Sequence, residues 1–361
     1  MLKRVEYLAW AARHYGHVQY NLASSGIPSL QQSELDTLPG PDREAGWQQL
    51  CDAIARHHGL SSKEVVATLG ASHGLWLAYT AIIRHGDEVL VENPAYEPLV
   101  AAAQAAGAVV RRFDRDMASG FVLDPERVFD ALSRKTRIVA ITNLHNPSGV
   151  RASDEAMRAV AERMHAQGGF LLVDEIYAPF DRFVGPDGVF RGTSRSLGPN
   201  ILATGSLTKA YGLGPERIGW LLGPEEVIAR ALDALVVSVG ELPLDWMNRG
   251  VWAFQHIVAL AERSRSLLGN KRKRVREWIA ARPSLTWSDP REGLFGLAIV
   301  PSGGDLRPAI ELGLERHGVL VAPGGFFGIP NSFRLAWSLP ENLLGDALDH
   351  LDAALRDSGL I

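Results

Sequence analysis

Cysteine is nearly absent from this sequence, since Cys51 is the only one among 361 residues. One cysteine excludes an intrachain disulfide framework and a zinc site built on paired thiolates, and it favours a reducing, cytosolic setting. The chain also lacks an apolar run near the ~20 residues needed to span a bilayer. Its start, MLKRVEYLAWAARHYG, has no long apolar core of a signal peptide. We therefore expect a soluble, unprocessed protein.

A strong excess of charge of either sign is missing as well. Lysine and arginine total 37 against 41 aspartates and glutamates, so the formal net charge is -4. This balance is not that of a nucleic-acid binder, and small molecules are the expected ligands. The basic run from Lys271 to Arg276 lies within a helical pattern, where a solvated helix face is expected in preference to a nucleic-acid patch.

The apolar pattern predicts an α/β fold. Continuous runs of Val, Ile and Leu indicate strands buried on both faces of a parallel or mixed sheet, and alanine-rich helical patterns alternate with them. The predicted strands are EVVATLG, DEVLVEN, VVRRFD, TRIVAITN, FLLVDE and NILATGS.

The later part of the chain predicts a second, smaller domain. Residues 225–282 carry mainly helical signals and are expected to include a long helix that links two lobes. Beyond them, LFGLAIVP, GVLVAPGG and SFRLAWS predict a smaller sheet. We place the large domain at residues 36–262 and the small domain at residues 1–35 together with 263–361.

Lys209 lies in the most informative segment, Ser206-Leu207-Thr208-Lys209 followed by AYGLGPERIGW. A lysine amine forms an imine with an aldehyde, and Ser206 and Arg217 are placed to bind a phosphate. This combination favours a covalently held, phosphorylated cofactor. By itself, a lysine in a serine-rich loop is typically a solvated surface charge.

Three residues near strand ends are candidates for holding an aromatic cofactor ring. Asp174 ends the apolar strand in FLLVDE, at the edge where open α/β sheets bind ligands. A pyridinium nitrogen would supply the cation that its buried carboxylate needs, although a helix cap or a local arginine would also satisfy it. Tyr177 and Asn146 are placed to contact the phenolic oxygen of that ring, while the NPSG of Asn146 is also a common turn.

Three further residues complete the candidate site. Ser72 stands at a helix start in TLGASHGLWLAY, where free N–H groups can cradle a phosphate, although a capped helix start needs no ligand. Tyr96 in ENPAYEPL either stacks on a cofactor ring or packs within its loop. Arg334 lies inside the apolar strand SFRLAWS, where either a substrate carboxylate or a structural salt bridge would pair its charge.

In chain order the motifs are GAS, PAY, HNPSG, DEIY, SLTK with Arg217 downstream, and FRLAWS. This series resembles the fold type I pyridoxal-phosphate (PLP) enzymes, specifically the class I/II aminotransferases, over nearly the whole chain. The resemblance implies a large PLP-binding domain around a mostly parallel seven-stranded sheet, with a smaller α/β C-terminal domain.

The resemblance also implies residue roles and an activity. The enzyme would move an amino group from an L-amino acid to a 2-oxo acid through pyridoxamine phosphate, as a homodimer with shared active sites. The implied roles are imine formation and proton transfer by Lys209, pairing with the ring nitrogen by Asp174, contact with the phenolic oxygen by Asn146 and Tyr177, ring stacking by Tyr96, phosphate binding by Ala71, Ser72, Ser206 and Arg217, and substrate binding by Gly26, Asn146 and Arg334.

Other activities remain open. The same scaffold hosts lyases, decarboxylases and cyclases, and SSG, HNPSG, SLTKAYGL and RHGVLVAPG also look like PLP-dependent cyclases of hydroxylated arginine derivatives. Tyr177 argues for an ordinary aminotransferase. A regulator that only senses PLP would need a separate DNA-binding domain, for which this chain has no spare residues.

Overall fold

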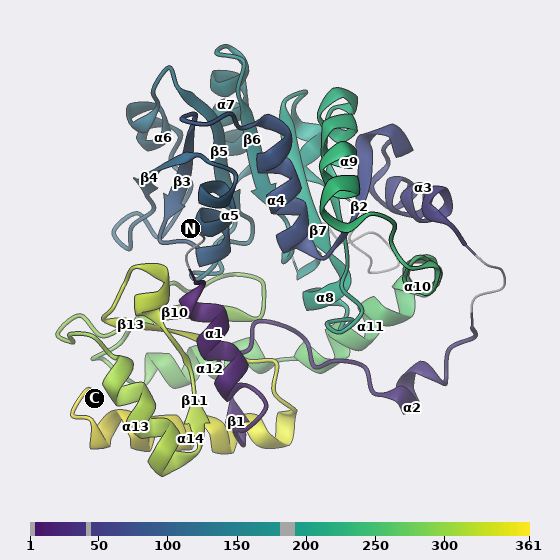
Figure 1. Ribbon diagram of the computed structural model, residues 1–361. Coiled ribbons are helices and arrows are strands. Elements are labelled where there is room, and N and C mark those ends of the chain that lie inside the picture. The colour runs from purple at the N-terminus through teal and green to yellow at the C-terminus, as the bar shows by residue number, and fades with distance from the viewer. Residues whose placement is uncertain (1–3, 41–44, 181–191) are drawn as a thin grey trace.

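A seven-stranded sheet forms the centre of the larger lobe in the computed structural model, which describes residues 4–40, 45–180 and 192–361 (Figure 1). Its strands are β2 (Val65–Leu69), β3 (Glu88–Asn93), β4 (Val109–Asp114), β5 (Thr136–Thr142), β6 (Phe170–Asp174), β7 (Ile201–Ser206) and β8 (Ile218–Leu222). All residues of β7 and β8 are buried, as the near-continuous apolar runs require for central strands.

The strand order is β2-β8-β7-β6-β5-β3-β4, and only β8 runs antiparallel to its neighbours. The predicted α/β fold with a seven-stranded, mostly parallel sheet is confirmed. Six of its strands correspond to the six predicted runs, but Ile218–Leu222 was not predicted as a strand. Its short IGWLL run follows a glycine-rich loop and is interrupted by Gly219, so the strand signal is weak.

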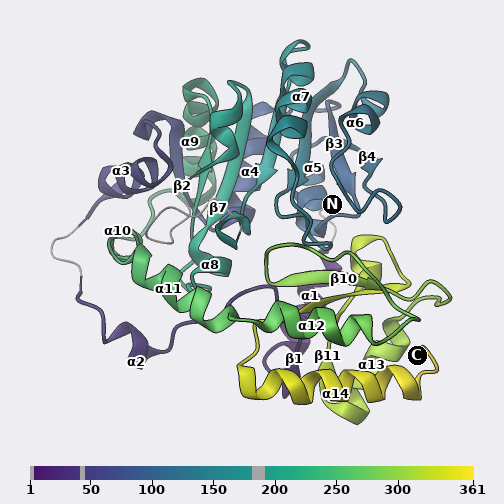
Figure 2. The same ribbon diagram turned by 180° about the vertical axis from the view of Figure 1, so that it is seen from behind.

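Helices cover both faces of this sheet (Figures 1 and 2). One face packs against α4 (Ala71–Ile82), α5 (Glu97–Ala105) and α9 (Glu225–Val239). The other packs against α3 (Trp47–His58), α6 (Pro125–Ala131) and α7 (Asp154–His165). Between β7 and β8 lies the short helix α8 (Leu207–Ala210).

The smaller lobe is built from both ends of the chain. Its antiparallel sheet has the order β12-β13-β10-β9, and a separate parallel pair joins β1 to β11. One apolar core joins the first described residues to the last third of the chain. The elements are α1 (Glu6–His14), β1 (Tyr20–Asn21), α12 (Lys271–Ala280), β9 (Thr286–Trp287), β10 (Phe295–Ile299), α13 (Arg307–His317), β11 (Val319–Leu320), β12 (Ala322–Pro323), β13 (Ser332–Ala336) and α14 (Glu341–Asp357).

Helices α10 (Leu244–Gln255), α11 (Ile257–Leu268) and α12 lead from the larger lobe to the smaller one (Figure 2). The expected single long helix is therefore wrong. His256 separates α10 from α11. Helix α11 ends at Gly269, whose φ of 44° lies in the left-handed region. The domain boundaries at 35/36 and 262/263 stay a prediction. The remaining short helix, α2 (Gln32–Leu35), precedes α3.

Candidate active site

Lys209 lies at the carboxyl edge of the large sheet, on α8 directly after β7. Ser206 ends the strand and caps the helix, since its Oγ accepts a hydrogen bond from the Thr208 N–H at 3.3 Å. Burial lowers the pKa of Lys209, and the positive charges of Arg334 and Arg217 lower it further. A lysine with a lowered pKa is more often neutral, and it is then a better nucleophile and base.

Asp174 ends β6, the strand parallel to and beside β7. Its carboxylate is buried, and burial followed by the negative charges of Glu92 and Glu175 raises its pKa to about 7. The Ile176 N–H donates to Oδ1 at 3.2 Å. In the described part of the chain, no arginine or lysine forms an ion pair with this carboxylate. Asp174 therefore lacks the cation that a buried negative charge needs.

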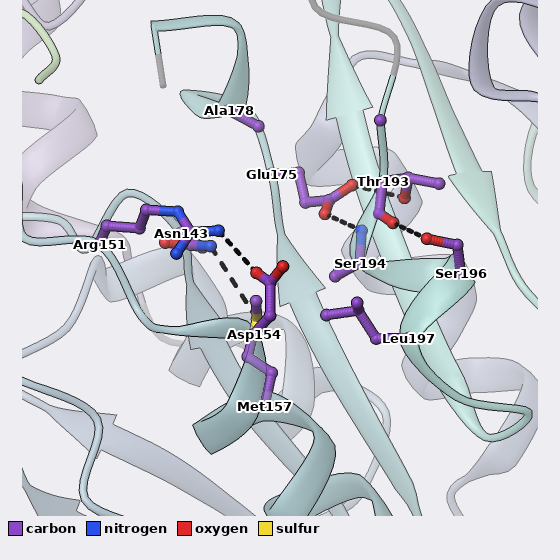
Figure 3. Close-up of a pocket in the computed structure, with 11 residues that line it drawn as sticks. Asn143, Arg151, Asp154, Met157, Glu175, Ala178, Thr193, Ser194, Ser196 and Leu197 are labelled. Carbon is purple, nitrogen blue, oxygen red and sulfur yellow. Dashed lines mark hydrogen bonds and ion pairs between the residues drawn. The ribbon is translucent and has the colours of Figure 1, made fainter. Parts of the chain in front are cut away.

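The adjacent acid, Glu175, belongs to a different environment. Its carboxylate accepts hydrogen bonds from Thr193 Oγ1 at 2.7 Å and from the Ser194 N–H (Figure 3). It lines a cavity of about 140 Å³, together with the ion pair of Arg151 and Asp154 at 2.6 Å. Glu175 is thus already satisfied by protein donors, whereas Asp174 is not.

The antiparallel strand β8 brings Arg217 to the start of α4. The ladder pairs Leu69 with Ile218 and Ser206 with Gly219, so the residue before β8 lies beside the ends of both β2 and β7. Arg217 adopts a left-handed φ of 54°, a conformation that non-glycine residues rarely take. Its side chain is exposed.

The turn before α4 fits closely around that arginine. Gly70 has a φ of 81°, which favours glycine, and a Cβ at this position would lie 2.5 Å from Arg217 Nη2, so this side chain would have to shift. Ala71 and Ser72 are the first residues of α4, where backbone N–H groups have no helical partner. Ser72 is exposed. The structure thus brings the predicted phosphate residues to one sheet edge.

Arg334 lies on β13 and is fully buried, yet in the described part of the chain it forms no ion pair with a carboxylate. Its Nη1 donates to Asn146 Oδ1 at 2.7 Å, and its Nη2 donates to Tyr7 Oη at 2.7 Å and to the Ala23 carbonyl at 2.9 Å. Its Nε has no partner. The alternative of a structural salt bridge is therefore wrong, and the guanidinium keeps donor capacity for a ligand.

The two predicted aromatic residues lie in the same region. Tyr177 is buried, and its hydroxyl donates to Ser25 Oγ at 2.9 Å. Tyr96 precedes α5 and is partly accessible, and the centre of its ring lies 6.0 Å from that of Tyr7 in an edge arrangement. Tyr96 thus packs against Tyr7 while part of its surface stays accessible.

Gly26 lies directly over the lysine. A Cβ at this position would stand 3.3 Å from Lys209 Cδ, closer than most such contacts. The next residue, Ile27, donates its N–H to the Lys209 carbonyl at 2.9 Å. The N-terminal segment thus forms one wall of the site, and its glycine leaves room for the lysine side chain.

Sequence reasoning missed Tyr7, Tyr15 and Ser25, which all contact predicted site residues or their partners. They lie in the first 25 residues and meet the site only through contacts with residues far along the chain. The helical spacing of Tyr7, Trp10 and Ala11 was the available signal, since all three are buried on one face of α1.

The basic run on α12 is balanced by acidic neighbours. Arg272 and Arg276 lie 3.6 and 3.3 Å from the carboxylate oxygens of Asp289, and Lys273 lies 3.8 Å from Glu277. These pairs are exposed and contribute little to stability. This face of the helix therefore carries mixed charge.

Within residues 4–40, 45–180 and 192–361, no helix combines the length and the apolar character needed to cross a membrane. The same residues contain no cluster of three His, Cys, Asp or Glu side chains arranged to hold a metal ion.

Comparisons with known proteins show the family to which the chain is similar. A profile of the family described as aminotransferase class I and II matches residues 43–351. Capreomycidine synthase of Streptomyces vinaceus is 31% identical, with 92% of this chain and 88% of that protein covered. The aspartate/prephenate aminotransferase of Thermus thermophilus is 30% identical, with 86% and 82% covered. The crystal structure of the PLP-dependent cyclase OrfR is 26% identical, covers 99% of this chain and 98% of its own, and superposes with a TM-score of 0.84.

Proposed function

The chain belongs to the aminotransferase class I and II family, and we propose that it is an aminotransferase that moves an amino group from an L-amino acid to a 2-oxo acid. The family is PLP-dependent and has fold type I. The observation that carries the proposal is a lysine of lowered pKa and a buried carboxylate at the edge of the large sheet, with a buried arginine on β13 of the smaller lobe. Among the described residues, that carboxylate pairs with no cation and that arginine pairs with no carboxylate.

These residues fit PLP. Asp174 forms no ion pair with a cation among the described residues, and a protonated ring nitrogen would supply one. Gly70 leaves space that any Cβ would fill beside Arg217, next to the free N–H groups of α4, which suits a phosphate. We assign Ala71, Ser72, Ser206 and Arg217 to the phosphate, Asp174 to the ring nitrogen, Asn146 and Tyr177 to the phenolic oxygen, Tyr96 to the ring face, and Lys209 to the aldehyde.

When bound, PLP supplies an aldehyde that combines with amines and a ring that withdraws electrons from the substrate Cα. Lys209 Nζ accepts the Cα proton and holds it, because its lowered pKa keeps a fraction of the amine neutral. Arg334 and Asn146 orient the substrate carboxylate, and Gly26 allows the substrate to lie beside the lysine.

The experiment is a single-turnover assay of the holoenzyme with one amino acid at a time and no oxo acid. Transamination predicts one 2-oxo acid per active site and conversion of PLP to pyridoxamine phosphate. Amino acids that bleach the absorbance of lysine-bound PLP identify the donor. A protein that binds PLP but converts none of them would be a sensor, which would contradict the proposal.

A PLP-dependent cyclase is the second candidate. It is favoured by the similarity to capreomycidine synthase and to the cyclase OrfR over nearly the whole chain. Both candidates need the same proton transfer at Lys209, so the products decide between them. Release of a cyclised product from a hydroxylated arginine derivative, with PLP retained, would favour the cyclase. Ammonia release with PLP retained would indicate a lyase.

We also propose a cytosolic homodimer with shared active sites. Supporting it, large apolar side chains are exposed near the end of α9 and the start of α10, including Val236, Val237 and Leu244. Light scattering after size-exclusion chromatography tests the assembly, and a mass near 39.3 kDa would contradict it.

A further inference from the structure

Tyr7 occupies a central position between the candidate substrate and cofactor residues. Its side chain is 4% exposed, its hydroxyl lies 2.7 Å from Arg334 Nη2, and its ring stands at an edge to Tyr96. Burial acts to raise the pKa of Tyr7, but the positive charges of Arg334 and Lys209 bring it below its ordinary value. The Tyr7 hydroxyl thus contacts Arg334 directly, and the charges of Arg334 and Lys209 both act on it.

The donor and the acceptor of each hydrogen bond around Tyr7 can be assigned in only one way. Tyr15 Oη donates its single proton to the Ala23 carbonyl at 2.9 Å. Tyr7 Oη, 2.8 Å from Tyr15 Oη, must then donate to it, and it accepts from Arg334 Nη2 in turn. Since Nη2 also donates to Ala23, the four groups form a closed ring of hydrogen bonds.

This ring limits how a carboxylate can bind Arg334. The guanidinium has five N–H groups, and three of them are engaged with Asn146, Tyr7 and Ala23. The free N–H groups are on Nε and Nη1, which do not form one fork. A bidentate carboxylate must therefore take a position beside Nη2, where Tyr7 Oη already lies.

We infer that Tyr7 is a further substrate-binding residue, whose hydroxyl accepts from Arg334 in the free enzyme and donates to the substrate carboxylate in the complex. The inference rests on the proposed role of Arg334. Rotation about the C–O bond of Tyr7 turns its phenolic proton away from Tyr15 and toward the carboxylate. The aromatic ring of Tyr7 therefore need not move. One carboxylate oxygen then gains both a charged and a neutral donor.

The larger lobe holds Tyr7 in this position. The Glu97 carboxylate accepts the N–H groups of Glu6 at 3.0 Å and of Tyr7 at 2.8 Å, which caps the first turn of α1. Glu97 directly follows Tyr96. The helix that carries Tyr7 is therefore anchored beside the residue proposed to contact the cofactor ring.

The test uses two amine probes that react with lysine-bound PLP whatever the natural donor is. Aminooxyacetate carries a carboxylate, and O-methylhydroxylamine does not. Stopped-flow loss of the cofactor absorbance gives a rate constant for each, and their ratio measures recognition of the carboxylate alone. We expect the wild-type holoenzyme to prefer aminooxyacetate by roughly 10- to 100-fold, as a charged hydrogen-bonded pair implies.

Tyr7→Phe should lower this ratio by about five- to tenfold, with little change in the rate for O-methylhydroxylamine. Tyr15→Phe is the matched control, since it removes a hydroxyl from the same ring but none that contacts Arg334. It should keep the preference. An equal loss in both variants, or an unchanged ratio in Tyr7→Phe, overturns the inference.

Failure of the underlying function gives a different result. If Arg334 does not bind the carboxylate, the wild type shows no preference, or Arg334→Lys retains it, and the inference about Tyr7 falls with that role. If Arg334→Lys loses the preference and Tyr7→Phe keeps it, only the inference about Tyr7 is wrong. Should Tyr7→Phe not fold, Glu97→Gln weakens the anchor of Tyr7 and should lower the ratio a few-fold, and an unchanged ratio again overturns the inference.

Discussion

The candidate site has a cofactor end with Asp174 and Lys209 and a substrate end with Arg334, and the two ends have opposite effects on ionisation. At the cofactor end, the environment disfavours ionisation, since burial raises the pKa of Asp174 and lowers that of Lys209. At the substrate end, burial acts to lower the pKa of Arg334, but the phenols of Tyr7 and Tyr15 raise it, so its charge is kept. In the part of the chain that the structure describes, Asp174 has no ion-pair partner, whereas Arg334 has three neutral acceptors. The first end suits a resident ligand that brings charge, and the second suits a ligand that is exchanged in each cycle.

Lys209→Ala should have the largest effect, because it removes the amine from the cofactor end. Borohydride reduction of the holoenzyme should no longer yield a cofactor covalently attached to the protein, and kcat should fall by roughly 10²–10⁴-fold or more. Mass spectrometry of the reduced protein checks the first outcome. An undiminished adduct in this variant would exclude Lys209 as the attachment point.

Asp174→Asn should lower kcat/KM by about 10²–10³-fold, since it leaves the ring cation without its buried partner. It also changes the stability of the cofactor-free protein with pH. Asp174 has a pKa of about 7, above the ordinary 3.8, so its folded state binds the proton more tightly. Its stabilising contribution is present below about pH 4 and is lost as pH rises to about 7.

Urea denaturation of the two cofactor-free proteins at about pH 5 and about pH 8 measures this difference. Between the two pH values, the wild type should lose stability relative to Asp174→Asn, by an amount on the order of a few kcal/mol. Equal pH dependence in both proteins would mean that Asp174 is not a desolvated carboxyl group.

Arg334→Lys tests the opposite end. A lysine keeps the positive charge but lacks the planar pair of N–H donors of a guanidinium. It therefore cannot donate to Asn146, Tyr7 and a substrate with the same geometry. We expect KM for the amino donor to rise by roughly 10- to 100-fold, with a smaller change in kcat. Steady-state kinetics with the donor found in the single-turnover screen provide the measurement. A fall in kcat at constant KM would place Arg334 outside substrate binding.

Gly70→Ala should act on the cofactor end alone. The added Cβ would meet Arg217 Nη2 at 2.5 Å and would hold a strained φ of 81°, costing about 1–3 kcal/mol. Fluorescence titration should show PLP affinity weakened by about tenfold, while the probe ratio that reports on Arg334 stays at its wild-type value. A change in that ratio would show that the two ends are coupled.

Neutralising the basic face of α12 should have the smallest effect. The double variant Lys273→Gln, Arg276→Gln removes two exposed ion pairs. Its free energy of unfolding should differ from that of the wild type by less than about 0.5 kcal/mol. Thermal unfolding and kcat/KM should match the wild type. A large loss of activity would show that this face has a function beyond mixed surface charge.

Much of the cofactor end could be predicted from the sequence, because its residues follow strands that are strongly apolar. Asp174 and Ser206 each stand directly at the end of such a strand, and parallel strands place their ends at one edge. Arg217 was found through its spacing from Lys209, but the strand that positions it was not, since β8 is short and contains Gly219.

The substrate end was harder to predict because it depends on contacts distant in sequence. Arg334 stood out as a charge within an apolar strand, yet its partners Tyr7 and Ala23 come from the opposite end of the chain. No local pattern encodes that pairing. The prediction of one long linking helix was wrong for a local reason. Gly269 permits a backbone turn that continuous helical periodicity does not reveal.

The pairing of β1 with β11 has a consequence for protein synthesis. Tyr20 is synthesised well before its strand partner Val319, which lies on the far side of the whole larger lobe in the sequence. Strand β1 therefore has no partner until β11 has been made, and this contact between distant segments delays folding of the smaller lobe. The surroundings of Arg334 are therefore complete only after both segments of the smaller lobe have been made.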